Sequence, residues 1–175
     1  TLVPHNIIGP RQKYDDPYRN VASIMINRCL QSLPPIIYGD GKQTRCFSFI
    51  QDVLNCLMTA CLDEKPIGNV INVGPDEEVV SINELADKIC KITNYNGNPK
   101  YLPARPQEVK HAICSSNKAR KILDYGTKVN LEDGLYSMVE YIKKRGISKF
   151  NRHIPVEIIS DLTPKTWISD RMNQK

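Results

Sequence analysis

The stretch Pro35-Ile36-Ile37-Tyr38-Gly39-Asp40-Gly41-Lys42-Gln43-Thr44-Arg45 decides the fold that this sequence predicts. It begins as a short apolar strand, continues into a glycine-bearing turn and ends on an arginine before a second predicted strand, residues 46–50. Asp-Gly between two β-prone runs favours a hairpin, because glycine tolerates the positive φ of a tight turn. A guanidinium at the base of a rigid hairpin can hold phosphate or carboxylate through two parallel hydrogen bonds. The stretch therefore predicts an anion site beside a hairpin.

Apolar periodicity on both sides of this stretch predicts an α/β chain. Residues 1–8 are typical of a strand, and residues 20–33 have helical spacing. Ser81 and Glu84 form a capping-box pattern in front of another helix. We expect a small mixed sheet with flanking helices, and a tail over 146–175 that packs as extended chain. Further helices are predicted at 53–61, 82–92, 116–123 and 131–144, and further strands at 69–73, 100–102 and 112–114.

Composition bounds the class of protein. The 175 residues are 41% hydrophobic and 25% charged, which is ordinary for a globular domain with one core. No apolar run approaches the roughly 20 residues of a membrane span, and no export signal is visible, so we expect a cytoplasmic protein without a membrane partner. The net charge of +5 is unclustered, which argues against a nucleic-acid partner. The six cysteines form no C-x-x-C pair, so we expect reduced thiols and no metal site.

Two other segments matter beside the stretch 35–45. They are Pro4-His5-Asn6-Ile7-Ile8-Gly9-Pro10-Arg11-Gln12 and Arg105-Pro106-Gln107-Glu108-Val109. Taken in order, the three segments resemble the C-terminal half of NAD-dependent nucleotide-sugar epimerases and dehydratases, the extended short-chain dehydrogenase family, with the UDP-glucose 4-epimerase-like branch nearest. The resemblance runs from about residue 4 to residue 145. It implies the C-terminal, substrate-binding part of an enzyme whose N-terminal Rossmann half is absent.

The resemblance assigns four residues to the first segment and the helix after it. It implies that Asn6 contacts the nucleotide sugar near its diphosphate, although Asn6 could instead stabilise the Gly9-Pro10 turn. Arg11 would open a loop toward the hexose. Asn20 and Val21 would start the helix beside the nucleotide, where Asn20 can also act as a plain N-cap.

Five more residues carry the remaining implied contacts. Ile36 and Tyr38 would hold the uracil ring, unless Tyr38 merely packs on the core. Arg45 and Arg105 would grip the diphosphate from separate loops. Glu108 would lie near the ribose hydroxyls, or would simply pair with Arg105.

The chain lacks two features that the family's chemistry requires. Its nine glycines never fall at the G-x-G-x-x-G or G-x-x-G-x-x-G spacing of a dinucleotide-binding turn. Tyr38 and Lys42 match the family's catalytic Tyr-x-x-x-Lys pair by spacing alone, since the two glycines between them exclude a helix. We therefore expect no catalytic residue in this chain and NAD bound mainly by the absent half. We divide the chain into 1–34, which continues from that half, a nucleotide-sugar-binding domain over 35–145 and a tail over 146–175.

Three functions stay open on the sequence. The first is the nucleotide-sugar-binding part of a UDP-sugar 4-epimerase, in which NAD oxidises the sugar at C4 and hydride returns to the opposite face. The intact enzyme would be a homodimer, and the fragment alone would not be catalytically competent. The second is a nucleotide-sugar 4,6-dehydratase, decarboxylase or C5 epimerase of the same family. The third is a non-catalytic nucleotide-sugar-binding module.

Overall fold

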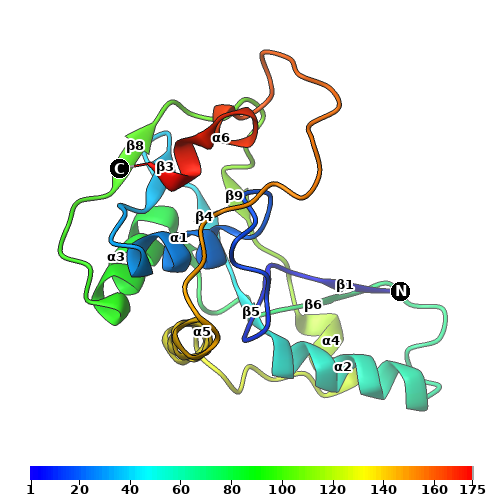
Figure 1. The fold of residues 1–175 in the computed structure, drawn as a ribbon. Helices are drawn as coiled ribbons and strands as arrows, with labels where there is room; N and C mark the ends of the chain where they lie inside the picture. The colour runs from blue at the N-terminus through cyan, green and yellow to red at the C-terminus, as the bar shows by residue number, and fades with distance from the viewer. Residues whose placement is uncertain (175) are drawn as a thin grey trace.

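A computed structural model describes residues 1–174 of the chain, which form several small sheets with helices around them (Figure 1). The predicted α/β class with flanking helices is confirmed, and the sheet is divided into short separate pieces. The strands are β1 (Leu2–Pro4), β2 (Ile7–Ile8), β3 (Ile36–Tyr38), β4 (Thr44–Arg45), β5 (Ser48–Phe49), β6 (Ile71–Val73), β7 (Val80–Ser81), β8 (Lys100–Leu102) and β9 (His111–Ala112). The helices are α1 (Val21–Leu30), α2 (Ile50–Leu62), α3 (Ile82–Thr93), α4 (Asn117–Leu123), α5 (Leu131–Arg145), α6 (Lys165–Ile168) and the 3-10 turn η1 (Asp170–Asn173).

The predicted strand over residues 1–8 is two strands with different partners. β1 pairs in parallel with β6, and β2 pairs in parallel with β5. Asn6 separates them with a φ of 41°, a left-handed conformation that asparagine tolerates better than most residues. Its side-chain amide also donates to the carbonyl of Cys46 at 2.9 Å, which holds the break in place.

The predicted hairpin at residues 35–50 is wrong. β3 pairs with β8, whereas β4 lies between β7 and β9, so the two strands on either side of the turn belong to different sheets. The turn itself forms, with φ of 67° at Gly39 and 72° at Gly41. Its backbone groups bond outward to the start of α3, since Asn83 donates to both the Asp40 and the Gly41 carbonyls. Long-range pairing therefore replaces the local ladder.

Helices α1, α3 and α5 surround the main core. α1 is the most enclosed, and Asn20 caps it by accepting a hydrogen bond from the backbone N–H of Ala22 at 2.8 Å. The capping box predicted at Ser81 and Glu84 is confirmed at the start of α3. The stripe predicted for α5 is also confirmed, because all four of its members are buried: Leu135, Met138, Val139 and Ile142.

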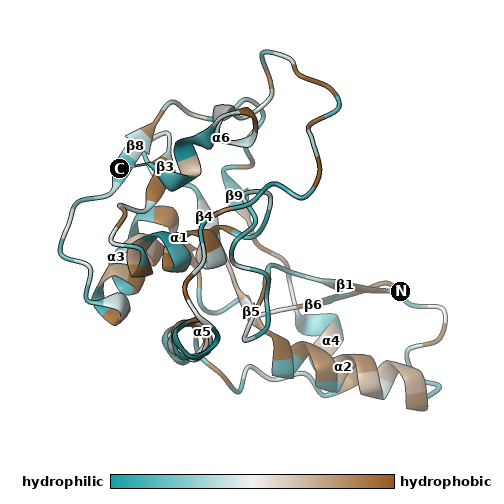
Figure 2. Ribbon diagram, in the orientation of Figure 1, coloured by the Kyte–Doolittle hydropathy of each residue, from teal (hydrophilic) through white to brown (hydrophobic). Residues whose placement is uncertain are grey.

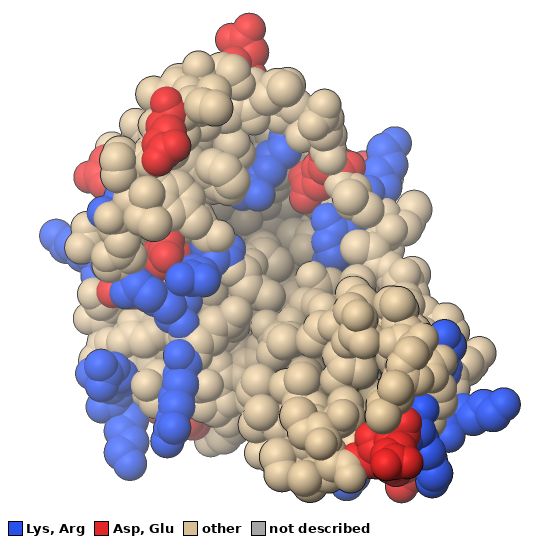
Figure 3. Space-filling view, turned by 90° about the vertical axis from the view of Figure 1, so that its right-hand side faces the viewer, with Lys and Arg blue, Asp and Glu red and all other residues tan. Residues whose placement is uncertain are grey.

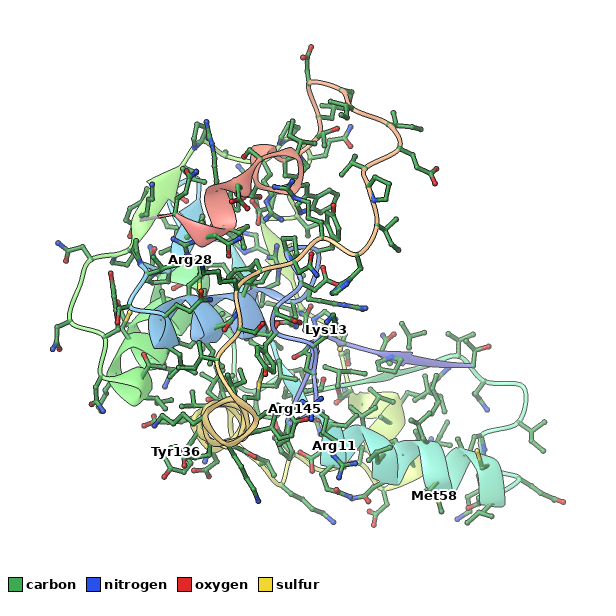
Figure 4. All side chains as sticks on the ribbon, in the orientation of Figure 1. Arg11, Lys13, Arg28, Met58, Tyr136 and Arg145 are labelled. Carbon is green, nitrogen blue, oxygen red and sulfur yellow. The ribbon has the colours of Figure 1, made fainter. Side chains whose placement is uncertain are left out.

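A second core lies between α2, β6 and α4. α2 contributes Val53 and Cys56 to it, while its outer face stays apolar and exposed (Figure 2). Met58 is 59% exposed and Leu62 is 79% exposed on that face, and Figure 4 shows Met58 directed away from the rest of the molecule. The amphipathic pattern thus buries only part of the apolar surface of α2.

The tail is not purely extended chain. Residues 165–168 form α6 and residues 170–173 form η1, and both pack back against α1 and β3 (Figure 1). Met172 and Phe150 join Ile24 and Ile36 in a third, smaller core. The last residue of the predicted tail, 175, lies outside the described residues.

Among the described side chains there is neither a disulfide nor a group of histidine, cysteine and carboxylate side chains suited to a metal ion. Cys29, Cys46 and Cys56 are buried as free thiols, and burial raises the pKa of Cys46 to about 11. None of the described helices is both long enough and apolar enough to cross a bilayer.

Asp76 ties the end of β6 to the start of α4. Its carboxylate accepts from the backbone N–H of Ser116 at 2.9 Å and from Arg120, and these contacts hold its pKa below the usual range. A lowered folded-state pKa stabilises the fold above the unfolded pKa of about 3.9, and this contribution is lost progressively as the pH falls from that value through the lower folded-state pKa.

We therefore expect Asp76→Asn to lower the free energy of unfolding by about 1 kcal/mol at pH 7, a modest value because the pair is partly solvated. The difference from the unsubstituted protein should shrink at pH 3. Urea denaturation at the two pH values measures it, and an equal difference at both would contradict the electrostatic cause.

Candidate functional site

A cavity of about 200 Å³ lies where the start of α1, strands β3 and β4, the loop after β8 and the tail meet. The face of the molecule drawn in Figure 3 is hollowed at its centre, with basic side chains on both sides of the hollow. A second cavity of about 430 Å³ adjoins the first and shares Tyr38, Gln43, Arg105 and Glu108 with it. The first cavity is smaller than the roughly 300–1,000 Å³ of drug-sized ligand pockets, so an elongated ligand would extend into the second.

Arg45 stands at the end of β4 in the wall of the first cavity. Its guanidinium donates to the Thr44 carbonyl at 2.8 Å and lies 3.7 Å from a carboxylate oxygen of Glu108. The side chain is only 16% exposed, so its orientation is set by the protein. A positive charge in a partly dehydrated wall attracts an anion more strongly than the same charge on an open surface.

Arg105 reaches the same cavity from the loop between β8 and β9. Its guanidinium carbon lies 3.9 Å from the centre of the Tyr38 ring, a cation–π contact that fixes the plane of the guanidinium. Its Nε is buried and has no hydrogen-bond acceptor within the described part of the chain. A buried donor without an acceptor is costly unless a ligand supplies one.

Glu108 and Gln43 connect the segment that carries Arg45 to the loop that carries Arg105. The Gln43 amide donates to the Tyr38 carbonyl at 3.0 Å and to the Glu108 carboxylate at 3.4 Å. Glu108 thus faces Arg45, and not Arg105 as the simpler alternative supposed. The lining residues include the arginines Arg19, Arg45 and Arg105 and the carboxylate of Glu108, so positive charge is in excess even though Arg19 also pairs with Asp16 at 3.2 Å.

Six of the nine residues singled out from the sequence line this cavity. They are Val21, Ile36, Tyr38, Arg45, Arg105 and Glu108. Asn20 lies one residue away as the cap of α1.

The other two residues face elsewhere. The amide of Asn6 is occupied by the Cys46 carbonyl. Arg11 lines a separate cavity of about 680 Å³ together with Lys13 and Arg145 (Figure 4). Their predicted contacts with a nucleotide sugar stay predictions.

Seven lining residues had not been singled out from the sequence, among them Arg19, Gln43, Thr166 and Met172. Arg19 immediately precedes Asn20, and Gln43 lies inside the decisive stretch, so both were within reach of the motifs. Thr166 and Met172 come from the tail, where no local pattern signals a binding role. Only the folded chain brings them to β3.

The described residues do not fit the pyrophosphate of a dinucleotide cofactor. Such a group is held by a glycine-rich turn between a strand and the N-terminus of a helix. β5 runs directly into α2 and β7 runs directly into α3, and neither junction contains a glycine. Tyr38 lies in a strand and Lys42 in the following turn, so they do not form a one-turn helical pair either.

The sequence model of the GDP-mannose 4,6-dehydratase family matches residues 1–138. Among curated proteins, the chain is 32% identical over 145 residues to a UDP-N-acetyl-alpha-D-glucosaminuronate decarboxylase of Bacillus cytotoxicus. This match covers 79% of the chain and 44% of the relative.

Two solved structures have a similar fold. A UDP-glucose 4-epimerase of Thermotoga maritima, in complex with UDP-glucose, has a TM-score of 0.74 and 32% identity over 82% of the chain. A UDP-glucuronic acid 4-epimerase of Bacillus cereus, in complex with UDP-glucuronic acid and NAD, has a TM-score of 0.75 and 33% identity over 83% of the chain. The present chain covers 45% of each of them, and thus spans less than half the length of these relatives.

Proposed function

Because the chain belongs to the NAD-dependent nucleotide-sugar epimerase and dehydratase family of extended short-chain dehydrogenases, we propose that it forms the nucleotide-sugar-binding portion of a UDP-sugar 4-epimerase. In this proposal the chain anchors the nucleoside diphosphate and leaves the chemistry at the sugar to residues outside it. Anchoring of this kind lowers the barrier by positioning the reacting carbon, even though the anchoring groups never touch it.

The convergence of Arg45 and Arg105 on one cavity carries the proposal. The two residues are 60 positions apart in the sequence, and they reach the cavity from strand β4 and from the loop between β8 and β9. Two guanidinium groups match the two negative charges of a diphosphate, and each can form charge-assisted hydrogen bonds to phosphate oxygens. The unpartnered Nε of Arg105 supports an acceptor at this position.

Tyr38 and Ile36 provide the adjoining wall for the base. Both lie in β3, and an aromatic ring beside an aliphatic side chain suits a flat, partly apolar ring. Glu108 is the carboxylate in the wall and can accept from ribose hydroxyls. Asn20 and Val21 place the N-terminus of α1 beside the cavity, where backbone N–H groups add to the positive potential.

NAD binding and hydride transfer are assigned in this proposal to a part of the protein beyond these 175 residues. The absence of a glycine-rich turn among the described strand–helix junctions supports this assignment. The parallel pair β1–β6 supports it too. Parallel sheets are normally covered by other elements on both faces, and in this proposal the further part of the protein supplies that cover. The exposed apolar face of α2, with Met58 and Leu62, offers a surface for such a cover. We expect the intact enzyme to be a homodimer.

Decarboxylation of a UDP-hexuronic acid is the second candidate, favoured by the 32% identity to the Bacillus cytotoxicus decarboxylase. A decarboxylase and an epimerase of this family share the anchoring of the nucleotide. They differ in what becomes of the sugar after oxidation, and this depends on groups near its reacting carbons.

A panel of nucleotide sugars tests both candidates on the full-length protein. Thermal shift is measured with UDP, UDP-glucose, UDP-glucuronic acid, and dTDP- and GDP-sugars, each with and without NAD. A ligand at 100 times its Kd stabilises the folded state by about 2.7 kcal/mol, which raises the Tm by several degrees. We expect the UDP compounds to do so. Product analysis then separates inversion at C4 from release of CO2, and a protein stabilised only by GDP-sugars would refute the UDP assignment.

A further inference from the structure

The C-terminal part of the chain, residues 150–174, folds back onto the candidate nucleotide cavity, and we call this segment the clasp. It lies beyond residues 1–138, which the family model matches. Thr166 and Met172 of the clasp line the cavity beside Tyr38 and Ile36. Both clasp residues are almost completely buried, at 2% and 5% exposure. The clasp is therefore a wall of the cavity, and this wall comes from residues that the family model does not match.

A buried arginine of α1 binds the clasp through hydrogen bonds. Arg28 of α1 is fully buried, and its guanidinium donates to the carbonyls of Arg171, Met172 and Gln174 in the clasp. It also donates to the Pro34 carbonyl at 2.6 Å, just before β3. Figure 4 shows Arg28 between α1 and the clasp. One guanidinium thus joins the clasp to the segment that leads into the cavity wall.

Two further contacts fix the ends of the clasp. The Asn173 amide bonds to both the N–H and the carbonyl of Phe150, which closes the segment on itself. The Trp167 ring meets the Tyr18 ring edge to face with 5.4 Å between the centroids. The ring contact holds the clasp against the loop before α1, and the short helix α6 lies beside β3.

Thr166 stands at the centre of this arrangement. Its hydroxyl is hydrogen-bonded to the hydroxyl of Tyr38, and the guanidinium of Arg105 lies over the Tyr38 ring at 3.9 Å from its centroid. A hydrogen bond to a tyrosine hydroxyl fixes the far end of the side chain and so favours one χ1 rotamer. Thr166 therefore holds the Tyr38 ring in place, and the ring supports the guanidinium of Arg105.

We propose that the clasp is part of the nucleotide-binding site and that Thr166 is a positioning residue, which aligns Arg105 for the diphosphate through Tyr38. This inference rests on the proposed function, because it adds a wall and a residue to the same site. Pre-alignment reduces the ordering that a ligand must otherwise impose on Tyr38 and Arg105 when it binds. The clasp also narrows the space beside Ile36, so it takes part in selecting which base fits.

The test compares three variants of the full-length protein by calorimetric titration with UDP and, separately, with NAD. Thr166→Val removes the hydroxyl and keeps the shape, and we expect it to weaken UDP binding roughly tenfold. Thr166→Ser restores the hydroxyl and should bind UDP within about threefold of the unsubstituted protein. Thr127→Val is the matched control, because it removes a threonine hydroxyl bonded to Tyr125 at 3.2 Å far from the cavity. It should leave UDP affinity unchanged, and none of the three should alter NAD affinity.

The outcomes separate the inference from the proposed function. If Thr166→Val and Thr166→Ser bind UDP as tightly as the unsubstituted protein, Thr166 does not position the site, while the proposed function stands. If Thr166→Ser is as weak as Thr166→Val, the hydroxyl is not the cause and the inference fails. If the unsubstituted protein binds neither UDP nor a UDP-sugar, the proposed function fails and takes the inference with it.

Discussion

Replacing Arg45 by glutamine in the full-length protein is expected to weaken UDP binding about 100-fold. Arg45 lines the cavity with most of its side chain buried, and its position is set by the Thr44 carbonyl and by Glu108. Glutamine keeps a hydrogen-bond donor but loses the charge and the paired geometry that a phosphate requires. It also leaves Glu108 facing the ligand without its cation, so the variant adds repulsion to the lost attraction.

Calorimetric titration with UDP, UDP-glucose and NAD measures this effect. NAD affinity should stay within about twofold, because a nucleotide-anchoring residue does not contact the cofactor. Arg145→Gln is the control, since Arg145 is an exposed arginine on a different cavity. An equal loss of UDP and NAD binding in Arg45→Gln would indicate general misfolding and would count against the assignment of Arg45 to the diphosphate.

Replacing Arg28 by methionine is expected to lower the free energy of unfolding by about 3 kcal/mol. Two effects oppose each other. Burial disfavours the charged guanidinium and lowers the pKa of Arg28 to about 10, although the group stays protonated at pH 7. Its removal takes a donor from the backbone carbonyls of residues 34, 172 and 174, at about 1–3 kcal/mol for each carbonyl that water cannot reach, whereas the Arg171 carbonyl still accepts from the N–H of Gln174. The unsatisfied carbonyls outweigh the recovered solvation.

Urea denaturation followed by two signals locates this loss. Trp167 is the only tryptophan of the sequence and lies in the clasp, so its fluorescence reports the clasp, whereas far-ultraviolet circular dichroism reports the helices. In Arg28→Met the fluorescence transition should precede the dichroism transition. Arg28→Lys keeps a charge with fewer donors and should lie between the two proteins, and the exposed Arg145→Met should change stability by less than about 0.5 kcal/mol. A coincident, unshifted pair of transitions in Arg28→Met would show that Arg28 does not latch the clasp.

The helices and the caps could be predicted from the sequence because their causes are local. The Asn20 cap, the Ser81–Glu84 capping box and the buried stripe of α5 each depend on residues within one or two turns. The turn at Gly39 and Gly41 was predicted for the same reason, since a positive φ there follows from residue type. The pairing of the two strands on either side of that turn is not local. The partners of β3 and β4 come from β7, β8 and β9, and the hairpin prediction failed on them.

The same distinction between local and long-range causes applies to the candidate site. The sequence by itself determined which side chains have the chemistry to hold a nucleoside diphosphate, because motif, charge and aromatic character are properties of short segments such as 35–45 and 105–109. Only the tertiary structure decided which of them meet. It set Arg105 on Tyr38, turned Glu108 toward Arg45, placed Arg11 on another cavity and brought Thr166 to the wall. The physical reason is that these contacts span tens of residues, so they depend on how separate elements pack and not on what any one segment prefers.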